Sequence, residues 1–116
     1  FNTFVYPDAS VVCNKIEESE KGHGICNPTL IVEVLSKSTE GYDRGQKFSN
    51  YRKIPTLQEY VLIQQDKAEV EVFYRPINTD LWKILTYSGL DATVILDSFD
   101  LELPMSRIYL DVLEDV

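Results

Sequence analysis

Glu33 lies in an otherwise apolar segment, Leu-Ile-Val-Glu-Val-Leu, that spans residues 30–35. A buried carboxylate without a partner costs several kcal/mol, so an apolar strand around Glu33 requires a compensating group. A structural ion pair, a protonated carboxyl group or a metal ion at an exposed edge of the strand would each compensate it. The residues themselves leave these three arrangements open.

Asp8 could supply a second carboxylate. It follows Tyr6 and Pro7 in an apolar segment that precedes the one containing Glu33. If the two segments form adjacent strands, each offers one carboxylate, and such oxygen ligands are those that Mg²⁺ prefers. A Pro-Asp pair is also typical of a turn or of the start of a strand, which is the structural alternative.

Lys47 is the third residue with suitable chemistry. A helical pattern at residues 40–53 advances about 100° per residue, which places on one face Arg44, Lys47, Phe48, Tyr51 and Ile54. We expect this face to pack on the sheet, so Lys47 would point toward an acidic partner there. The structural alternative is a lysine whose aliphatic stem packs while its ammonium group reaches solvent.

Hydrophobic periodicity predicts the elements that position these residues. Residues 29–35, apolar on both faces, are typical of a central strand covered on both sides. The helix at residues 40–53 has Thr39 as its N-cap and Pro55 just beyond its end. Further strands are predicted at residues 4–13, 59–64, 69–74, 81–87 and 92–96, and a terminal helix at residues 105–112.

This order of elements indicates an α+β, or mixed α/β, fold with one helix packed on a mixed sheet. The strands at residues 59–64, 69–74 and 81–87 should form an antiparallel meander. The last two alternate between apolar and polar residues, so each is expected to bury one face and expose the other.

Length and composition restrict the range of functions. A chain of 116 residues and 13.3 kDa forms a single domain over residues 1–116, which excludes a tandem or multidomain enzyme. Its net charge of −8 argues against loose electrostatic attraction to nucleic acid or anionic lipid, although bound metal would change the charge of one cleft. No apolar run is long enough to cross a membrane and no signal peptide is recognisable, so we expect a cytoplasmic protein without membrane partners. With two cysteines (Cys13 and Cys26) and one histidine (His23), neither a disulfide scaffold nor a zinc site is expected.

Four blocks of the sequence are specific when taken together, although no single one is. They are Tyr6-Pro7-Asp8, residues 27–39 (Asn-Pro-Thr-Leu-Ile-Val-Glu-Val-Leu-Ser-Lys-Ser-Thr), residues 42–51 (Tyr-Asp-Arg-Gly-Gln-Lys-Phe-Ser-Asn-Tyr) and residues 59–62 (Glu-Tyr-Val-Leu). These blocks resemble the Uma-two family, a group described as restriction endonucleases in the PD-(D/E)XK nuclease superfamily. The resemblance runs from residue 6 to about residue 74 and continues more weakly to the C-terminus. It implies a restriction-endonuclease-like fold, DNA as the substrate and Mg²⁺ or Mn²⁺ as the cofactor.

Carried over residue by residue, the resemblance implies that Asp8 and Glu33 bind the metal ion together with the backbone carbonyl of Val34. The superfamily usually has a lysine two residues after the glutamate, where this sequence has a leucine. In this family the lysine lies on the following helix, at the position of Lys47, where it would orient the attacking water. Lys37 is the fallback candidate, because it shares the strand face of Glu33 if the strand continues that far.

The resemblance implies a metal-dependent DNA endonuclease that hydrolyses phosphodiester bonds, and it also implies a homodimer. Members of the family have an N-terminal helix and early strands, so we expect this chain, which begins at Phe1, to be truncated at its N-terminus. The alternative is a catalytically inactive nuclease-like fold that acts as a binding or assembly module, with Glu33 and Lys47 as a buried ion pair. The acidic charge and the lack of a basic patch in the sequence favour this alternative.

The remaining candidates have mainly structural interpretations. Arg44 could contact a phosphate or pair with Asp43 or a C-terminal acid. Glu59 is expected to face solvent at the start of its strand rather than to support the site. The aromatic residues of the C-terminal half are expected in the core or at a partner surface rather than as stacking platforms for bases: Phe73, Tyr74 and Trp82.

Overall fold

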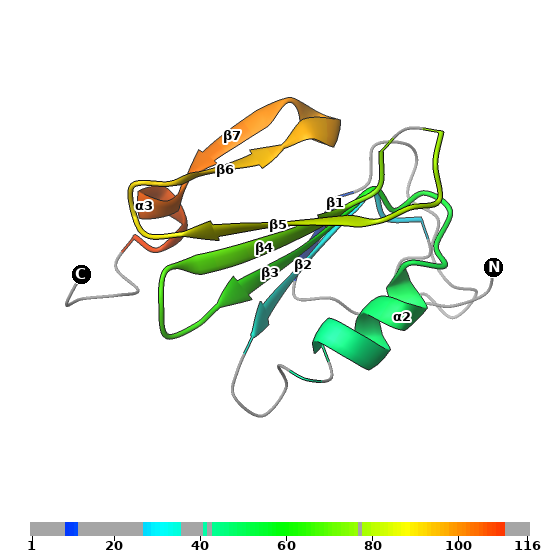
Figure 1. The fold of residues 1–116 in the computed structure, drawn as a ribbon, viewed down its shortest axis with the longest axis horizontal. Coiled ribbons are helices and arrows are strands. Elements are labelled where there is room, and N and C mark those ends of the chain that lie inside the picture. The colour runs from blue at the N-terminus through cyan, green and yellow to red at the C-terminus, as the bar shows by residue number, and fades with distance from the viewer. Residues whose placement is uncertain (1–8, 12–26, 36–40, 42, 77, 111–116) are drawn as a thin grey trace.

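The computed structural model describes residues 9–11, 27–35, 41, 43–76 and 78–110 (Figure 1). Its centre is a five-stranded mixed sheet with the strand order β1-β2-β3-β4-β5, accompanied by a two-stranded hairpin of β6 and β7. The strands of the main sheet are β1 (Ala9–Val11), β2 (Leu30–Leu35), β3 (Glu59–Gln64), β4 (Glu69–Tyr74) and β5 (Lys83–Ser88). This mixed α+β architecture confirms the predicted fold class.

The pairing directions explain where the helix lies. β2 and β3 are parallel, while β1 pairs with β2, β4 with β3, and β5 with β4 in the antiparallel direction. A parallel pair needs a crossover connection, and here the segment between β2 and β3 contains the helix. Strands β3 to β5 form the predicted meander. β2 is an interior strand, as predicted, although the middle position belongs to β3.

The crossover helix combines a π-helical turn, η1 (Asp43–Lys47), with a short α-helix, α2 (Phe48–Tyr51). These residues fall within the helix predicted at residues 40–53, while the expected N-cap, Thr39, lies outside the described residues. The helix ends earlier than predicted, because Arg52 is already its C-cap. Pro55 disfavours helical backbone at the residue before it, so the chain leaves the helix through a turn.

The two faces of the sheet are covered by different elements (Figure 1). One face packs against α2 through a cluster of buried residues: Ile31, Leu35, Tyr51, Ile54, Leu57, Tyr60, Leu62 and Phe73. The other face packs against the hairpin of β6 (Thr93–Leu96) and β7 (Leu101–Pro104), the 3-10 turn η2 (Asp97–Phe99) and the helix α3 (Met105–Ile108). The site described below lies on the α2 face.

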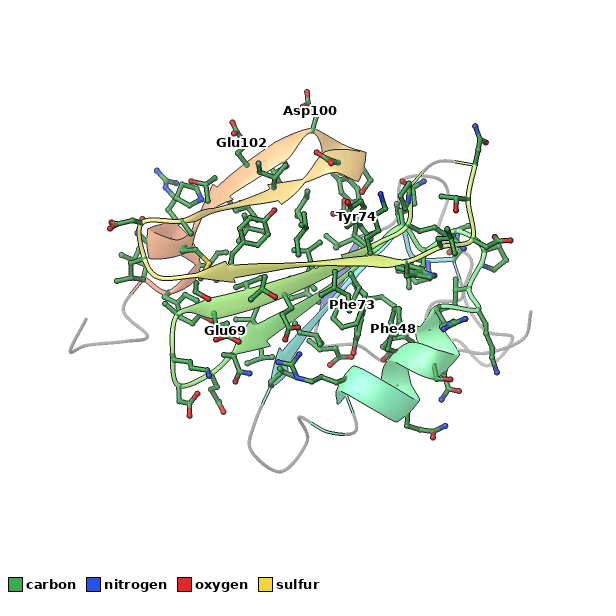
Figure 2. All side chains as sticks on the ribbon, in the orientation of Figure 1. Phe48, Glu69, Phe73, Tyr74, Asp100 and Glu102 are labelled. Carbon is green, nitrogen blue, oxygen red and sulfur yellow. The ribbon has the colours of Figure 1, made fainter. Side chains whose placement is uncertain are left out.

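Aromatic contacts fix α2 on the sheet. The ring of Phe48 stacks on that of Tyr60 with 5.5 Å between centroids, and it meets Phe73 at 4.7 Å and Trp82 at 5.3 Å. Figure 2 shows Phe48 on the helix facing Phe73 on the sheet. Phe73 and Trp82 belong to this core cluster, and Tyr74 packs against the cluster on the other face, as predicted. These contacts set the height of α2 above the strands and therefore the reach of its polar side chains.

Several exposure patterns differ from prediction. β5 does not bury one face, because Ile84 is 55% and Leu85 43% exposed, one on each side of the strand. β5 is an edge strand of the main sheet, so it has a neighbouring strand on one side only. Val34 is also 43% exposed, so β2 is not fully covered on the face opposite α2. Residues 101–104 form β7, a strand that the sequence did not suggest, and α3 ends at Ile108, earlier than expected.

Candidate active site

Glu33 lies on the α2 face of β2, and only 2% of its surface is exposed. The ammonium nitrogen of Lys47 is 3.0 Å from Glu33 Oε1. The hydroxyl group of Tyr51 donates a hydrogen bond to the same oxygen, also at 3.0 Å. Of the arrangements considered for Glu33, the structure therefore shows the ion pair, reinforced by a neutral donor.

The helix delivers both donors because of their spacing. Lys47 and Tyr51 are four residues apart, so they lie one above the other on the same side of the helix. The side chain of Lys47 is 25% exposed, which means that its stem packs while its ammonium group reaches the acid rather than bulk solvent. The sequence placed Tyr51 on the correct face but gave no role to its hydroxyl group. The four-residue spacing from Lys47 was the signal that could have found it.

A second ion pair lies beside the first. Glu33 pairs in register with Leu62, and Leu62 pairs with Glu71, so the three side chains lie in a row across β2, β3 and β4 on the α2 face. Arg44 forms an ion pair with Glu71. Because Arg44 and Lys47 are three residues apart, one side of the helix contacts acids on both sides of Leu62. The sequence offered Arg44 other acidic partners, and Glu71 could be found only from the strand register.

The structure does not describe every residue that the sequence suggested for the site. Asp8 and Lys37 lie outside the described residues, as do Cys13, His23 and Cys26. The neighbour of Asp8, Ala9, pairs with Val32 in antiparallel β1 and β2.

Among the described residues, few groups could act as ligands of a metal ion at Glu33. Among the residues described, no group of three or more His, Cys, Asp or Glu side chains could hold a metal ion. Glu33 supplies a carboxylate, and Glu71 supplies another that is already paired with Arg44. The side chain of Val34 faces away from Glu33, as strand alternation requires, so only its backbone could contribute on that side.

Glu59 corrects one prediction. It was expected to face solvent, but only 2% of its surface is exposed. The backbone N–H of Ser98 donates to Glu59 Oε1 at 3.1 Å, and the hydroxyl group of Ser98 donates to the same oxygen. Glu59 lies on the hairpin face of β3, where η2 covers it, so it supports the fold rather than the site. The position of η2 in space was not visible in the sequence.

Burial raises the pKa of Glu59 above its ordinary value of 4.5, and the hydrogen bonds from Ser98 only partly offset this effect. A raised pKa means that this residue's contribution to stability is fully present below pH 4.5 and is lost as the pH rises through the raised pKa. We therefore expect Glu59→Gln to gain stability relative to the wild type as the pH rises, by up to about 1.4 kcal/mol per pH unit over that window. Urea unfolding at a series of pH values measures this difference.

Glu102→Gln is the matched control, since Glu102 is an exposed acid on β7. It removes the same charge from an exposed position, so a comparison of the two variants isolates the effect of burial. A stability difference for Glu59→Gln that changes with pH no more than that for Glu102→Gln would contradict the assignment.

No helix in the described ranges is long and apolar enough to span a membrane.

Comparisons with known proteins show the family to which the chain belongs. The family model Uma2, described as "Putative restriction endonuclease", matches residues 2–106. Two uncharacterized proteins of Synechocystis sp., slr1290 and sll1609, are each 38% identical to this chain, over 106 and 93 residues. The matches cover 91% and 79% of this chain but 54% and 52% of those proteins, so the chain spans about half the length of the curated relatives.

A solved structure has the same fold. It is the crystal structure of "a putative nuclease belonging to DUF820" from Anabaena variabilis, with a TM-score of 0.68. The alignment covers 94% of this chain and 62% of that one, at 24% sequence identity. At this level of identity the likeness establishes the fold alone.

Proposed function

The chain belongs to the Uma2 family, and from this premise we propose that it is a metal-dependent DNA endonuclease that hydrolyses phosphodiester bonds. The observation that carries the proposal is the ammonium nitrogen of Lys47, 3.0 Å from the buried carboxylate of Glu33. A buried acid and lysine on facing elements are expensive to desolvate, and such pairs are found at functional sites more often than elsewhere. The family suggests the reaction in which this pair would act, which is the hydrolysis of phosphodiester bonds.

The proposed metal ligands are Asp8, Glu33 and the backbone carbonyl of Val34. Ala9, the residue after Asp8, pairs with Val32, the residue before Glu33, and this pairing supports the choice of Asp8. All three groups offer oxygen, the ligand atom that Mg²⁺ and Mn²⁺ prefer. When bound, such an ion polarises the scissile phosphate and lowers the pKa of a water molecule.

Lys47 would act beside the metal ligands. Its ammonium group carries three N–H donors, of which one suffices for Glu33. Beside Glu33, this ammonium group could orient the attacking water or stabilise the negative charge that develops on the phosphate. Tyr51 would be a positioning residue, because its hydroxyl group fixes the carboxylate of Glu33 without reaching the substrate itself.

One observation favours the alternative of an inactive binding or assembly module. Lys47 and Tyr51 both engage Glu33 Oε1, so the buried carboxylate is already compensated without a metal ion. A purely structural ion pair would look the same in the described residues. Metal binding distinguishes the endonuclease from the inactive module, since a purely structural ion pair does not need a divalent ion.

The test uses the full-length protein with plasmid DNA and linear duplex DNA. We expect nicking or cutting with Mg²⁺ or Mn²⁺ and none with EDTA, and we expect the metal to raise the melting temperature. Absence of cleavage with either ion, together with a melting temperature that does not respond to them, would establish the inactive module instead.

A further inference from the structure

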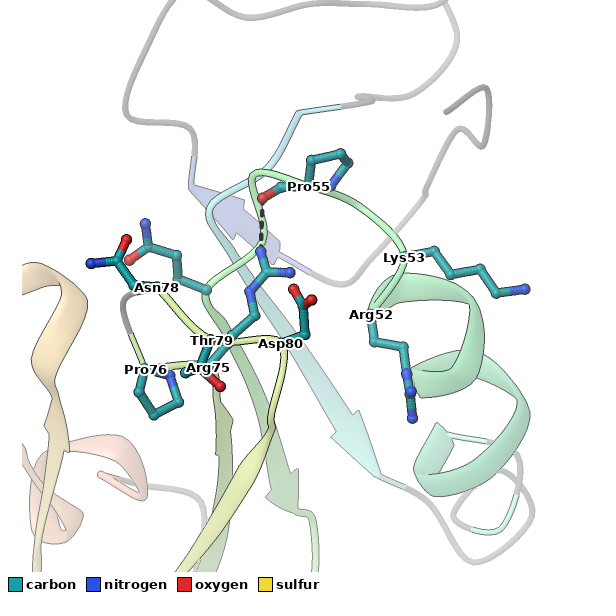
Figure 3. A pocket seen from close by; sticks show the side chains of 9 residues that line it. Arg52, Lys53, Pro55, Arg75, Pro76, Asn78, Thr79 and Asp80 are labelled. Atoms are coloured by element: carbon teal, nitrogen blue, oxygen red, sulfur yellow. Dashed lines mark hydrogen bonds between the residues drawn. The ribbon is translucent and has the colours of Figure 1, made fainter.

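A pocket of about 690 Å³ opens where the end of the helix meets the connection between β4 and β5 (Figure 3). The chain approaches it from two sides, since residues 52–58 follow α2 and residues 75–80 follow β4. Its polar lining comprises Arg52, Lys53, Gln58, Arg75, Asn78 and Asp80. The pocket lies next to the candidate active site in the chain, because Arg52 directly follows Tyr51.

The charge of this pocket is opposite to that of the whole chain. Three cations and one carboxylate line it, in a protein with a net charge of −8. Within the described part of the chain, neither Arg52 nor Lys53 nor Arg75 forms an ion pair. The sequence showed no basic patch because the fold builds this one from residues more than 20 positions apart. Unpaired cations gathered at one cavity indicate an anionic ligand.

Arg75 is held in place and keeps unused donors. Its Nη2 donates to the carbonyl oxygen of Pro55 at 2.7 Å and to that of Leu57, and its guanidinium carbon lies 5.3 Å from the ring centroid of Trp82. Both hydrogen bonds leave from the same nitrogen, so the N–H groups on Nε and Nη1 have no acceptor among the described residues. A guanidinium group held in one orientation, with N–H donors still available, can bind a phosphate oxygen.

The helix end faces Arg75 across the pocket. Figure 3 shows Arg75 reaching toward Pro55, with Arg52 and Lys53 extending from the helix end and Lys53 pointing outward at the rim. Both are exposed, so their long side chains can turn toward a ligand at little cost. Asn78 adds an amide from the opposite side.

We propose that this pocket binds a backbone phosphate of the DNA strand beside the scissile phosphate, through Arg75 with Arg52 and Lys53. This inference rests on the proposed function, since it assigns a second contact between the protein and its DNA substrate. A free nucleotide also carries a phosphate, so the experiment distinguishes binding of DNA from binding of a nucleotide.

The experiment measures binding of fluorescein-labelled duplex DNA to the full-length protein by anisotropy, in EDTA and at several salt concentrations. The double variant Arg52→Gln/Lys53→Gln should bind at least about 10-fold more weakly, and its log-log salt slope should fall by ~0.9, the value for one lost phosphate contact. Lys67→Gln/Arg107→Gln is the matched control, since it removes two exposed cations far from the pocket and should change neither quantity much. Arg75→Lys keeps the charge but not the planar donors, so it should also weaken binding, and its melting temperature should fall because Arg75 donates to two backbone carbonyl oxygens.

Several results would contradict a role for the pocket in DNA binding. Equal binding by the pocket variant and the wild type, equal losses in pocket and control variants, or no DNA binding at all would overturn the inference. So would displacement of DNA by a mononucleotide as effectively as by unlabelled duplex, since the pocket would then serve a free nucleotide. Loss of cleavage on Glu33→Gln with unchanged binding by the pocket variant refutes this inference alone. Loss of binding by the pocket variant, with no metal-dependent cleavage by the wild type, refutes the proposed function and leaves the phosphate pocket standing.

Discussion

Glu33→Gln should reduce metal-dependent DNA cleavage by at least about 100-fold while the protein stays folded. The substitution keeps the shape of the side chain and an oxygen that can accept the hydrogen bond of Tyr51. It removes the negative charge that a divalent ion requires, and losses of this size are typical when one essential electrostatic contact is removed. Initial rates of plasmid nicking in Mg²⁺ or Mn²⁺ measure the change.

The fold should tolerate this change better than the reaction does. Lys47 loses its ion pair with Glu33, but its side chain is 25% exposed and can turn its ammonium group toward solvent. The melting temperature of Glu33→Gln should therefore lie close to that of the wild type. Glu102→Gln, an equal loss of charge on the far hairpin (Figure 2), should leave the cleavage rate unchanged. Cleavage by Glu33→Gln at the wild-type rate would remove Glu33 from the reaction.

The part of the site that the sequence predicted depends on local periodicity. The 3.6-residue period placed Lys47 and Tyr51 on the helix face that packs on the sheet, and the apolar strand around Glu33 required a compensating partner. The structure joins these two expectations in a single contact of 3.0 Å. Both were accessible because each depends on residues a few positions apart.

The parts that the sequence did not predict depend on register and on long-range packing. Glu71 is near Arg44 only because β4 pairs with β3 so that Glu71 stands opposite Leu62. Glu59 is buried only because the segment around Ser98, 39 residues later, folds over it. Neither strand register nor the docking of a distant turn follows from a short window of sequence.

The same reason applies to the phosphate pocket. Arg75 gains its orientation from two carbonyl oxygens of the turn after α2 and from the ring of Trp82. In the sequence, Arg52 and Lys53 do not form a long basic run, and Arg75 lies more than 20 positions away. The net negative charge of the chain therefore conceals the three cations until the fold brings them together. Charge asymmetry in a small α+β domain is therefore a property of the folded surface.

Lys47→Met should lower the free energy of unfolding by about 3 kcal/mol. Methionine keeps the unbranched stem that packs on the sheet, so the change isolates the loss of the ammonium group. Glu33 is only 2% exposed, so it would keep a buried charge that has lost its ion pair with Lys47, although the hydrogen bond from Tyr51 remains. Removing one partner of a buried ion pair typically costs ~3–5 kcal/mol, and the partial exposure of Lys47 places the expected cost at the lower end.

A double-mutant cycle measured by urea unfolding separates this effect from lost packing. Glu33→Gln/Lys47→Met removes both charges, so it should recover about 2 kcal/mol relative to Lys47→Met alone. Tyr51→Phe is the companion variant, since it removes a neutral donor from the same oxygen and should cost ~1.5 kcal/mol. If Lys47→Met costs less than Tyr51→Phe, or the double variant recovers nothing, then the ammonium group does not compensate the buried carboxylate. Glu33 would then need another partner to account for its burial.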